Sequence, residues 1–440
     1  MKDRKKQKRR KISTGTVFML VMLAVVLGGS ALVLGRLSSG ASVDLSRLQM
    51  TVLDIRNENR NEADETEEQP ETGEMQKTSQ NIAMTPVVRV TPVPQDDEDS
   101  FTLTLAGSIS LSGEVRKNSR STDAKVADYA DVMMLLSPEI NSSVNGVFLE
   151  NILSSRHKAS DAVAPEDAVL LLKEAGFDFA ACGFSQAYSS GKDGISATLE
   201  TLNSQGIRAL GIHSTEDAGI PEVRTVNGVR TAIMQYTTTV PDKTRKSMDK
   251  DGTSGMVPEA ELSRISKDII SAREQGAEAV IVLVNWGKTG KDPDRKQIEL
   301  AQGIAEAGAD LIVGNGSHVP QPAEFLRGRE GKEVLCVWSL GSLLSGDRSN
   351  IKRLTGYLLH VTIRRDGKGG AEIRNPEYTP LYTWKYKQDG RFYYRCIAAG
   401  GKAPDGMDSE QQKNMNRAAE TVRNVLQDSP LTERGQTDAE

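Results

Sequence analysis

Three polar side chains with different chemistry each follow a short apolar run in this 440-residue chain: Glu150, Asn285 and His318. A carboxylate, a carboxamide and an imidazole can together bind a cation, hold a polar ligand through hydrogen bonds, or move a proton. The chain has only four histidines and three cysteines, and the cysteine spacings match no zinc pattern. What these residues can do therefore depends on whether the fold brings them together.

The elements that must position them are typical of an α/β domain. The apolar runs Ala279–Val284 and Ala309–Val313 flank a helical pattern over Pro293–Ala307, and Val334–Leu340 forms a further run. Short apolar runs that alternate with a helix predict strands buried on both faces, with functional residues on the loops that follow them. In the first half, similar runs include Val144–Leu149. We therefore predict a sandwich of mixed sheets flanked by helices.

Charge is distributed unevenly along the chain. The formal net charge is −5, which gives no case for nucleic-acid binding. Residues Met1–Lys11 carry eight Lys or Arg, and Ile12–Gly35 carries no charge. About 20 apolar residues span a bilayer, and flanking basic residues favour the cytoplasmic side. We predict a basic cytoplasmic tail (residues 1–11) and one transmembrane signal-anchor helix (residues 12–35) in contact with membrane lipid, with the main domain extracytoplasmic at the cell membrane.

An alternative interpretation of the N-terminus is a cleaved signal peptide with a cut site near Ser39-Gly40-Ala41. The apolar run is long for a signal-peptide core, which favours the uncleaved anchor. Residues 36–100 are acidic and rich in Pro and Thr, which predicts a flexible stalk that cannot bury enough apolar surface to fold. We predict a folded domain over residues 101–400 and a C-terminal helix and tail over residues 401–440.

From Phe101 to Ser345 the sequence resembles the CapA family of poly-γ-glutamate capsule biosynthesis proteins, relatives of the calcineurin-like metallophosphoesterases. The resemblance rests on colinear segments: GFDFAACGFSQAYSSGKDGISATLETLNSQGIRALGI from Gly176, TVNGVRTAIMQYT from Thr225, VNWGKTG from Val284, AEAGADLIVGNGSHVPQP from Ala305 and VWSLGSLL from Val337. The resemblance implies a metallophosphoesterase-like fold with a two-metal site on loops at strand ends.

The sequence departs from that family pattern at the implied metal ligands. The family's Gly-Asp corner is Gly107-Ser108 here, its Asn-Asn-His box is Phe184-Ser185-Gln186, and its His-Trp-Gly box is Asn285-Trp286-Gly287. Glu150 and His318 keep the family's residue types. Ser, Gln and Asn are neutral and weak ligands for transition metals. One carboxylate and one imidazole cannot neutralise two metal ions. We therefore predict no metal, no cofactor and no catalytic residue.

The prediction that replaces the metal site is a vestigial cleft that binds a polar ligand through hydrogen bonds. Its predicted lining residues are Ser108, Glu150, Gln186, Asn285, Trp286 and His318. For Trp286, packing against the sheet is an equal alternative, and for His318 a packing role is an alternative to ligand binding.

Three functional hypotheses follow. The first is a non-catalytic binding or scaffolding component of capsule or cell-envelope polymer biosynthesis or export, with an anionic polymer as candidate ligand. The second is an active hydrolase or transferase on anionic envelope polymers that uses Glu150 and His318. The third is a structural partner of a membrane polymer synthase or exporter, which would contact it through the anchor and a short juxtamembrane helix predicted over Ala41–Ile55.

Overall fold

The computed structural model describes residues 99–118, 129–214, 221–388 and 390–435. All of them belong to one compact unit, which lies within Ala83–Glu440. The predicted basic tail and anchor, and the predicted stalk up to residue 98, lie outside the described residues. Among the helices that are described, none is long and apolar enough to cross a membrane.

The larger sheet contains nine strands within the described residues. Strands β1, β2, β5 and β6 run parallel, and β14, β15 and β16 continue the sheet beyond β1 with antiparallel pairing. The order across the sheet is β16 (Arg391–Ala398), β15 (Ala371–Gln388), β14 (Thr355–Arg365), β1 (Ser100–Ile109), β2 (Val144–Leu149), β5 (Phe179–Ala181) and β6 (Arg208–Leu210), with β13 (Ser342–Leu344) beside β1 and β17 (Thr432–Glu433) beside β15.

The second sheet has six described strands, and its four central ones, β12, β10, β9 and β8, run parallel. Antiparallel strands close its two edges. The order is β11 (Ala323–Arg327), β12 (Glu333–Val337), β10 (Leu311–Asn315), β9 (Ala279–Asn285), β8 (Val229–Thr237) and β7 (Val223–Val226). A separate two-stranded pair joins β3 (Ile152–Leu153) to β4 (Val163–Ala164).

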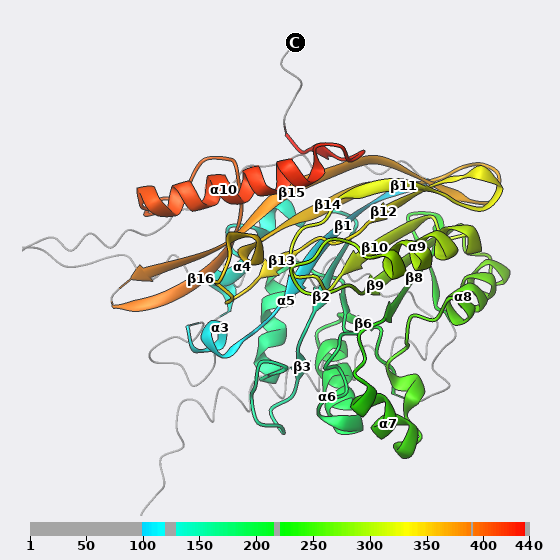
Figure 1. Ribbon diagram of the computed structural model, residues 1–440, viewed down its shortest axis with the longest axis horizontal. Helices are drawn as coiled ribbons and strands as arrows, with labels where there is room; N and C mark the ends of the chain where they lie inside the picture. The colour runs from blue at the N-terminus through cyan, green and yellow to red at the C-terminus, as the bar shows by residue number, and fades with distance from the viewer. Residues whose placement is uncertain (1–98, 119–128, 215–220, 389, 436–440) are drawn as a thin grey trace, which may run out of the picture. The chain divides into compact units, whose positions relative to one another are not determined.

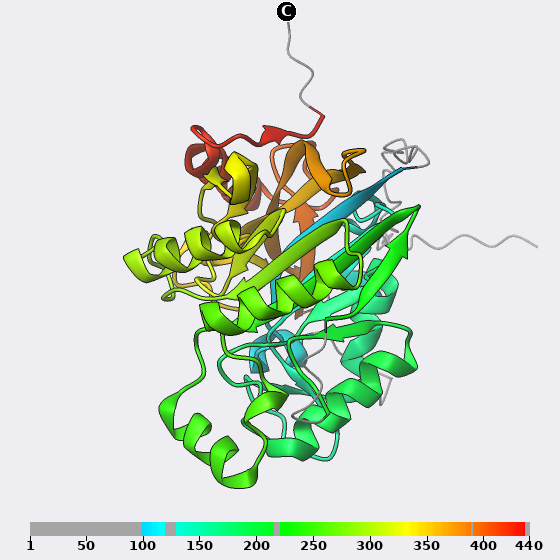
Figure 2. The same ribbon diagram turned by 90° about the vertical axis from the view of Figure 1, so that its right-hand side faces the viewer.

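Helices cover the outer faces of both sheets, whereas α10 (Ser409–Leu426) packs on β14 and β15 on the side of the core between the sheets (Figures 1 and 2). The helices are α3 (Gly113–Lys117), α4 (Ala130–Met133), α5 (Val169–Ala175), α6 (Gly191–Ser204), α7 (Asp242–Asp251), α8 (Leu262–Glu274), α9 (Arg295–Ala307) and α10. Helices α4, α5 and α6 bury apolar residues against the larger sheet, and α8 and α9 bury theirs against the second sheet.

A shared apolar core lies between the two sheets. Phe101, Leu103 and Phe148 of the larger sheet belong to the same buried cluster as Ile281 and Val313 of the second sheet. Helix α10 packs on β14 and β15, and apolar residues near its C-terminal end join this cluster. The predicted sandwich of mixed sheets flanked by helices is thus the observed architecture, and the C-terminal helix is packed onto it.

Local signals in the sequence account for several boundaries. Helix α9 begins with a capping box, in which the Asp294 side chain accepts a hydrogen bond from the Gln297 N–H. It ends at Gly308, whose φ of 107° suits a residue without Cβ. The β7–β8 hairpin turns at Asn227-Gly228, both with positive φ, as its sequence predicts.

Two elements had no visible sequence signal. Helix α7 is polar on nearly all sides and buries Met248 alone, so it shows no apolar periodicity. Strand β11 is a largely exposed edge strand of five residues. Both are elements whose formation depends on the neighbours they pack against.

Candidate functional site

Glu150 forms the centre of a small polar site. It directly follows β2, and its backbone N–H donates to Ile109 O over 3.0 Å. Its side chain is buried, with Oε2 3.2 Å from His318 Nδ1 and Oε1 3.5 Å from Asn285 Nδ2. The His318 side chain is 27% exposed, so the site can be reached from solvent at the imidazole.

Parallel strands explain why residues so far apart in sequence meet. Asn285 is the last residue of β9, and His318 lies three residues beyond the end of β10, where its φ is 56°. Carboxyl ends of parallel strands lie at the same edge of a sheet, so loops that follow neighbouring strands converge. Because Glu150 belongs to the larger sheet, the site forms where the two sheets meet.

Burial is the main influence on the Glu150 carboxyl group. Removal from water raises the pKa of Glu150 above its ordinary value. Electrostatic attraction to His318, the hydrogen bond from Asn285 and the charge of Arg353 lower the pKa of Glu150 and so act in the opposite direction. Asn285 is itself held by Thr239, whose hydroxyl donates to Asn285 Oδ1 over 2.9 Å. The carboxyl group is therefore only partly compensated.

Arg353 is a site residue that the sequence did not reveal. Its Nη1 donates to Ser317 O over 3.3 Å, and its Nε donates to Asp347 over 2.9 Å. It lies in the 3₁₀ turn Ile351–Leu354, which follows a loop with no strand or helix pattern. No motif in the sequence points to it, since its position depends on how this turn packs.

Ser108 lies inside β1, where the pairing with β2 shifts register. The residue is 1% exposed, and its hydroxyl has no hydrogen-bond partner among the described residues. The Asn315 carboxamide is oriented so that its oxygen and nitrogen both have hydrogen-bond partners. In this orientation its oxygen accepts from the Ser108 backbone N–H over 3.0 Å, and its nitrogen donates to Gly341 O over 3.1 Å. Asn315 thus ties β1 to the second sheet close to the strand ends.

Trp286 and Gln186 lie elsewhere. Trp286 has no exposed surface. The centroid of its ring lies 5.6 Å from that of Trp338, and its Nε1 donates to Trp338 O over 2.9 Å. It therefore takes the alternative of packing against the sheet and does not line a cleft. Gln186 is exposed after β5 and lines a different pocket, together with His157, Lys158 and several serines.

The residues at the strand ends do not fit a two-metal centre. Such a centre needs several carboxylates and imidazoles, and here one of each is present and the two contact each other. Asn285 and Ser108 supply neutral donors of low affinity for transition metals. Across the described part of the chain, no group of three or more His, Cys, Asp or Glu is placed to hold a metal ion.

Comparison with known proteins identifies the family. Residues 102–347 match the model of the bacterial capsule synthesis protein PGA_cap family, which is more than half of the chain. The chain belongs to this family. The capsule biosynthesis protein CapA of Bacillus anthracis is 27% identical over 266 residues, which cover 58% of this chain and 62% of that protein. The PGA biosynthesis protein CapA of Bacillus subtilis is 25% identical over 282 residues, which cover 63% of this chain and 71% of that protein.

The chain thus spans under two thirds of the length of the Bacillus anthracis relative. Among solved structures, the calcineurin-like phosphoesterase YfkN from Bacillus subtilis is similar with a TM-score of 0.39 and 11% sequence identity. That similarity covers 75% of this chain and 98% of the phosphoesterase chain.

Proposed function

We propose that this member of the PGA_cap family is a membrane-anchored, extracytoplasmic protein that binds or scaffolds an envelope polymer during capsule assembly, without metal. The observation that carries the proposal is the direct contact between Glu150 and His318, 3.2 Å apart, at the strand ends where the family resemblance implies metal ligands. A carboxylate and an imidazole that bond to each other are not directed at a pair of cations.

The binding role is supported by the character of the remaining groups. The site offers a partly exposed imidazole, the guanidinium of Arg353 and a carboxamide, and these are donors that suit carboxylate or hydroxyl groups of a polymer. The membrane anchor is supported by the uncharged run Ile12–Gly35 and the basic residues before it.

The test uses the full chain, extracted in detergent and purified without chelator. Elemental mass spectrometry is expected to find no transition metal above background, and manganese or zinc is expected to leave the midpoint of thermal unfolding unchanged. Poly-γ-glutamate, used as probe, is expected to bind without being cleaved. Close to two metal ions per chain would overturn the proposal.

A second candidate function is supported by the same geometry. A buried carboxyl group beside an accessible imidazole can transfer protons, so hydrolysis or transfer on an anionic polymer through Glu150 and His318 is the alternative. It predicts saturable cleavage of poly-γ-glutamate that is lost in both Glu150→Gln and His318→Gln. If turnover survives both substitutions, this alternative is wrong.

A third candidate role is that of a structural partner of a membrane synthase or exporter. This role rests on the predicted anchor. It predicts that exchanging residues 12–55 for an unrelated transmembrane helix and juxtamembrane segment abolishes capsule formation in cells, while Glu150→Gln has no effect there.

A further inference from the structure

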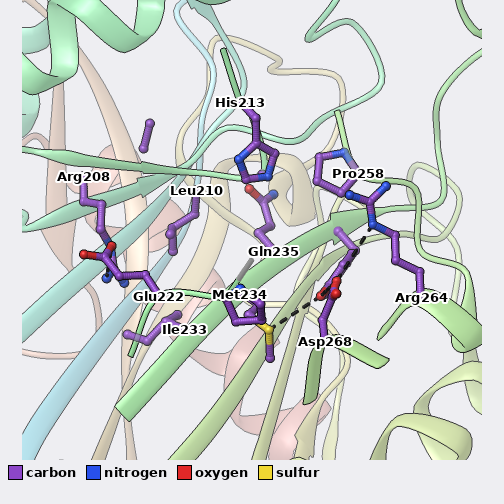
Figure 3. Close-up of a pocket in the computed structure, with 14 residues that line it drawn as sticks. Arg208, Leu210, His213, Glu222, Ile233, Met234, Gln235, Pro258, Arg264 and Asp268 are labelled. Atoms are coloured by element: carbon purple, nitrogen blue, oxygen red, sulfur yellow. Dashed lines mark hydrogen bonds and ion pairs between the residues drawn. The ribbon is translucent and has the colours of Figure 1, made fainter. Parts of the chain in front are cut away.

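A cavity of about 210 Å³ lies away from the strand-end site, between β6 of the larger sheet and β8 of the second sheet (Figure 3). Its walls carry two arginines, a histidine and two carboxylates, and its remaining lining is largely apolar. The residues with polar side chains are Arg208, His213, Glu222, Gln235, Tyr236, Arg264 and Asp268. None of Glu150, Asn285 and His318 lines it.

Arg264, on α8, forms one wall and has unused hydrogen-bond donors. Its Nε lies 3.9 Å from Asp268 Oδ2, which is beyond hydrogen-bond distance. That same oxygen accepts the hydroxyl of Tyr236 over 2.7 Å. Within the described part of the chain, the Arg264 guanidinium makes no hydrogen bond. A fork of N–H groups at a cavity wall is therefore free to bind an oxyanion.

His213 lies between the two arginines at the top of the cavity in Figure 3. Its backbone N–H donates to Met256 O over 2.9 Å, which fixes the residue after β6. Its ring makes no hydrogen bond to another described residue. Burial, together with the positive charge of Arg264, lowers the pKa of His213 to about 4. A neutral imidazole with a free N–H can donate one more hydrogen bond into the cavity.

Arg208 extends the positive charge to the opposite side of the cavity. Its Nη1 is 3.5 Å from Glu222 Oε2, at the limit of hydrogen bonding, while Glu222 Oε1 accepts a closer bond of 2.8 Å from Arg224. Burial lowers the pKa of Arg208, and the charge of Arg224 adds to that effect. One exposed carboxylate shared by two guanidinium groups leaves this wall positive.

The floor of the cavity is apolar, with Leu210, Ile233 and Met234 among its lining. The carboxamide of Gln235 is already used, because it accepts from Gly183 N over 2.9 Å and donates to Gly183 O over 3.0 Å. We propose that this cavity binds a small organic oxyanion, with a carboxylate or phosphate group against Arg264 and His213 and a short apolar portion on the floor. This inference goes beyond the proposed function, and its failure would leave the strand-end site unaffected.

The test is calorimetric titration of the full chain in detergent at low ionic strength, with butyrate, butyl phosphate and butylammonium as probes. Butyrate or butyl phosphate is expected to bind saturably, and whichever binds more tightly identifies the anionic group. Butylammonium, with the same tail and opposite charge, is expected not to bind. Arg264→Gln is expected to weaken binding about tenfold or more, because it removes charge-assisted hydrogen bonds.

His213→Gln serves as the second variant, since the ring has no hydrogen bond within the described residues whose loss would unfold the protein. It is expected to weaken binding about threefold to tenfold, as expected for one neutral hydrogen bond. Arg295→Gln, which removes an arginine that is 89% exposed on α9, is the matched control and is expected to leave binding unchanged. The proposal is wrong if neither anion binds, if butylammonium binds equally well, or if Arg264→Gln and His213→Gln bind as the unmodified chain does.

Discussion

Two buried carboxylates at opposite edges of the strands differ in how completely their charge is compensated. Asp310 directly precedes β10, is 1% exposed, and contacts Arg273 over 2.7 Å and Lys332 over 2.5 Å. The Val280 N–H donates to it over 2.6 Å. Glu150 follows β2. Its carboxylate contacts the imidazole of His318 over 3.2 Å and the carboxamide of Asn285 over 3.5 Å, which is the limit of hydrogen bonding.

The difference separates a structural carboxylate from a candidate functional one. At the amino ends of the strands, two cations and a backbone N–H contact the Asp310 carboxylate and link α8 to the residues that precede β10 and β12. At the carboxyl ends, Glu150 is buried without equivalent partners, which raises its pKa. Incomplete compensation of this kind is typical of groups kept for binding or proton transfer.

The largest expected effect is that of Asp310→Asn. Removing the charge leaves two partly exposed cations facing a buried amide, and the loss of both ion pairs to a buried carboxylate costs about 3 kcal/mol. Urea unfolding of the full chain measures the change. Glu299→Gln, which disrupts an exposed pair with Arg295, is the control and is expected to change stability by less than about 0.5 kcal/mol. Equal effects of the two variants would remove the distinction between structural and surface charges.

A smaller effect is expected when two of the metal ligands that the family resemblance implies are introduced. The double variant Ser108→Asp, Asn285→His adds a carboxylate and an imidazole near Glu150 and His318, and we expect it to bind manganese. At a hundredfold excess over its dissociation constant, manganese would stabilise it by about 2.7 kcal/mol. Thermal unfolding with and without manganese measures this gain. If manganese stabilises the unmodified chain by the same amount, the unmodified site binds metal and the proposed absence of metal is wrong.

The smallest expected effect is that of Glu150→Gln on stability. The folded chain holds the Glu150 proton more tightly than the unfolded chain does, so the carboxyl group favours folding most below its unfolded pKa. That contribution is lost as pH rises through the raised, folded pKa. The substituted carboxamide cannot ionise, so the variant should gain stability relative to the unmodified chain as pH rises from about 4 to about 8. Unfolding curves across this range measure it, and a gain at falling pH would contradict the pKa direction.

Much of the fold followed from signals in the sequence. The apolar runs became β2, β9, β10 and β12, and Asn227-Gly228 gave the hairpin. The proximity of Asn285 and His318 also follows from parallel strands, because polar residues after such strands lie at the same edge of a sheet. Their contact with Glu150 depends on how the two sheets pack together. The predicted anchor and its cytoplasmic tail remain predictions, since residues 1–98 lie outside the described residues.

Other parts of the site depended on packing. Side chains alternate along a strand, so Trp286 shares a face with Val282 and Val284 and enters the core under the helices, while Asn285 points the other way. This alternation was available in the sequence and favours the packing role. The position of Arg353, in contrast, depends on a 3₁₀ turn that no local pattern reveals.

The Gln235 side chain, which bonds both the N–H and the carbonyl of Gly183, has a consequence for hydrogen exchange. Gly183 follows β5 of the larger sheet, and its amide proton is protected by a side chain from β8 of the second sheet. Its exchange with solvent therefore requires loss of a hydrogen bond between the two sheets, which fraying of an edge strand does not break. We expect the Gly183 amide to exchange at the slow rate of global unfolding, which makes it a reporter of sheet docking at single-residue resolution.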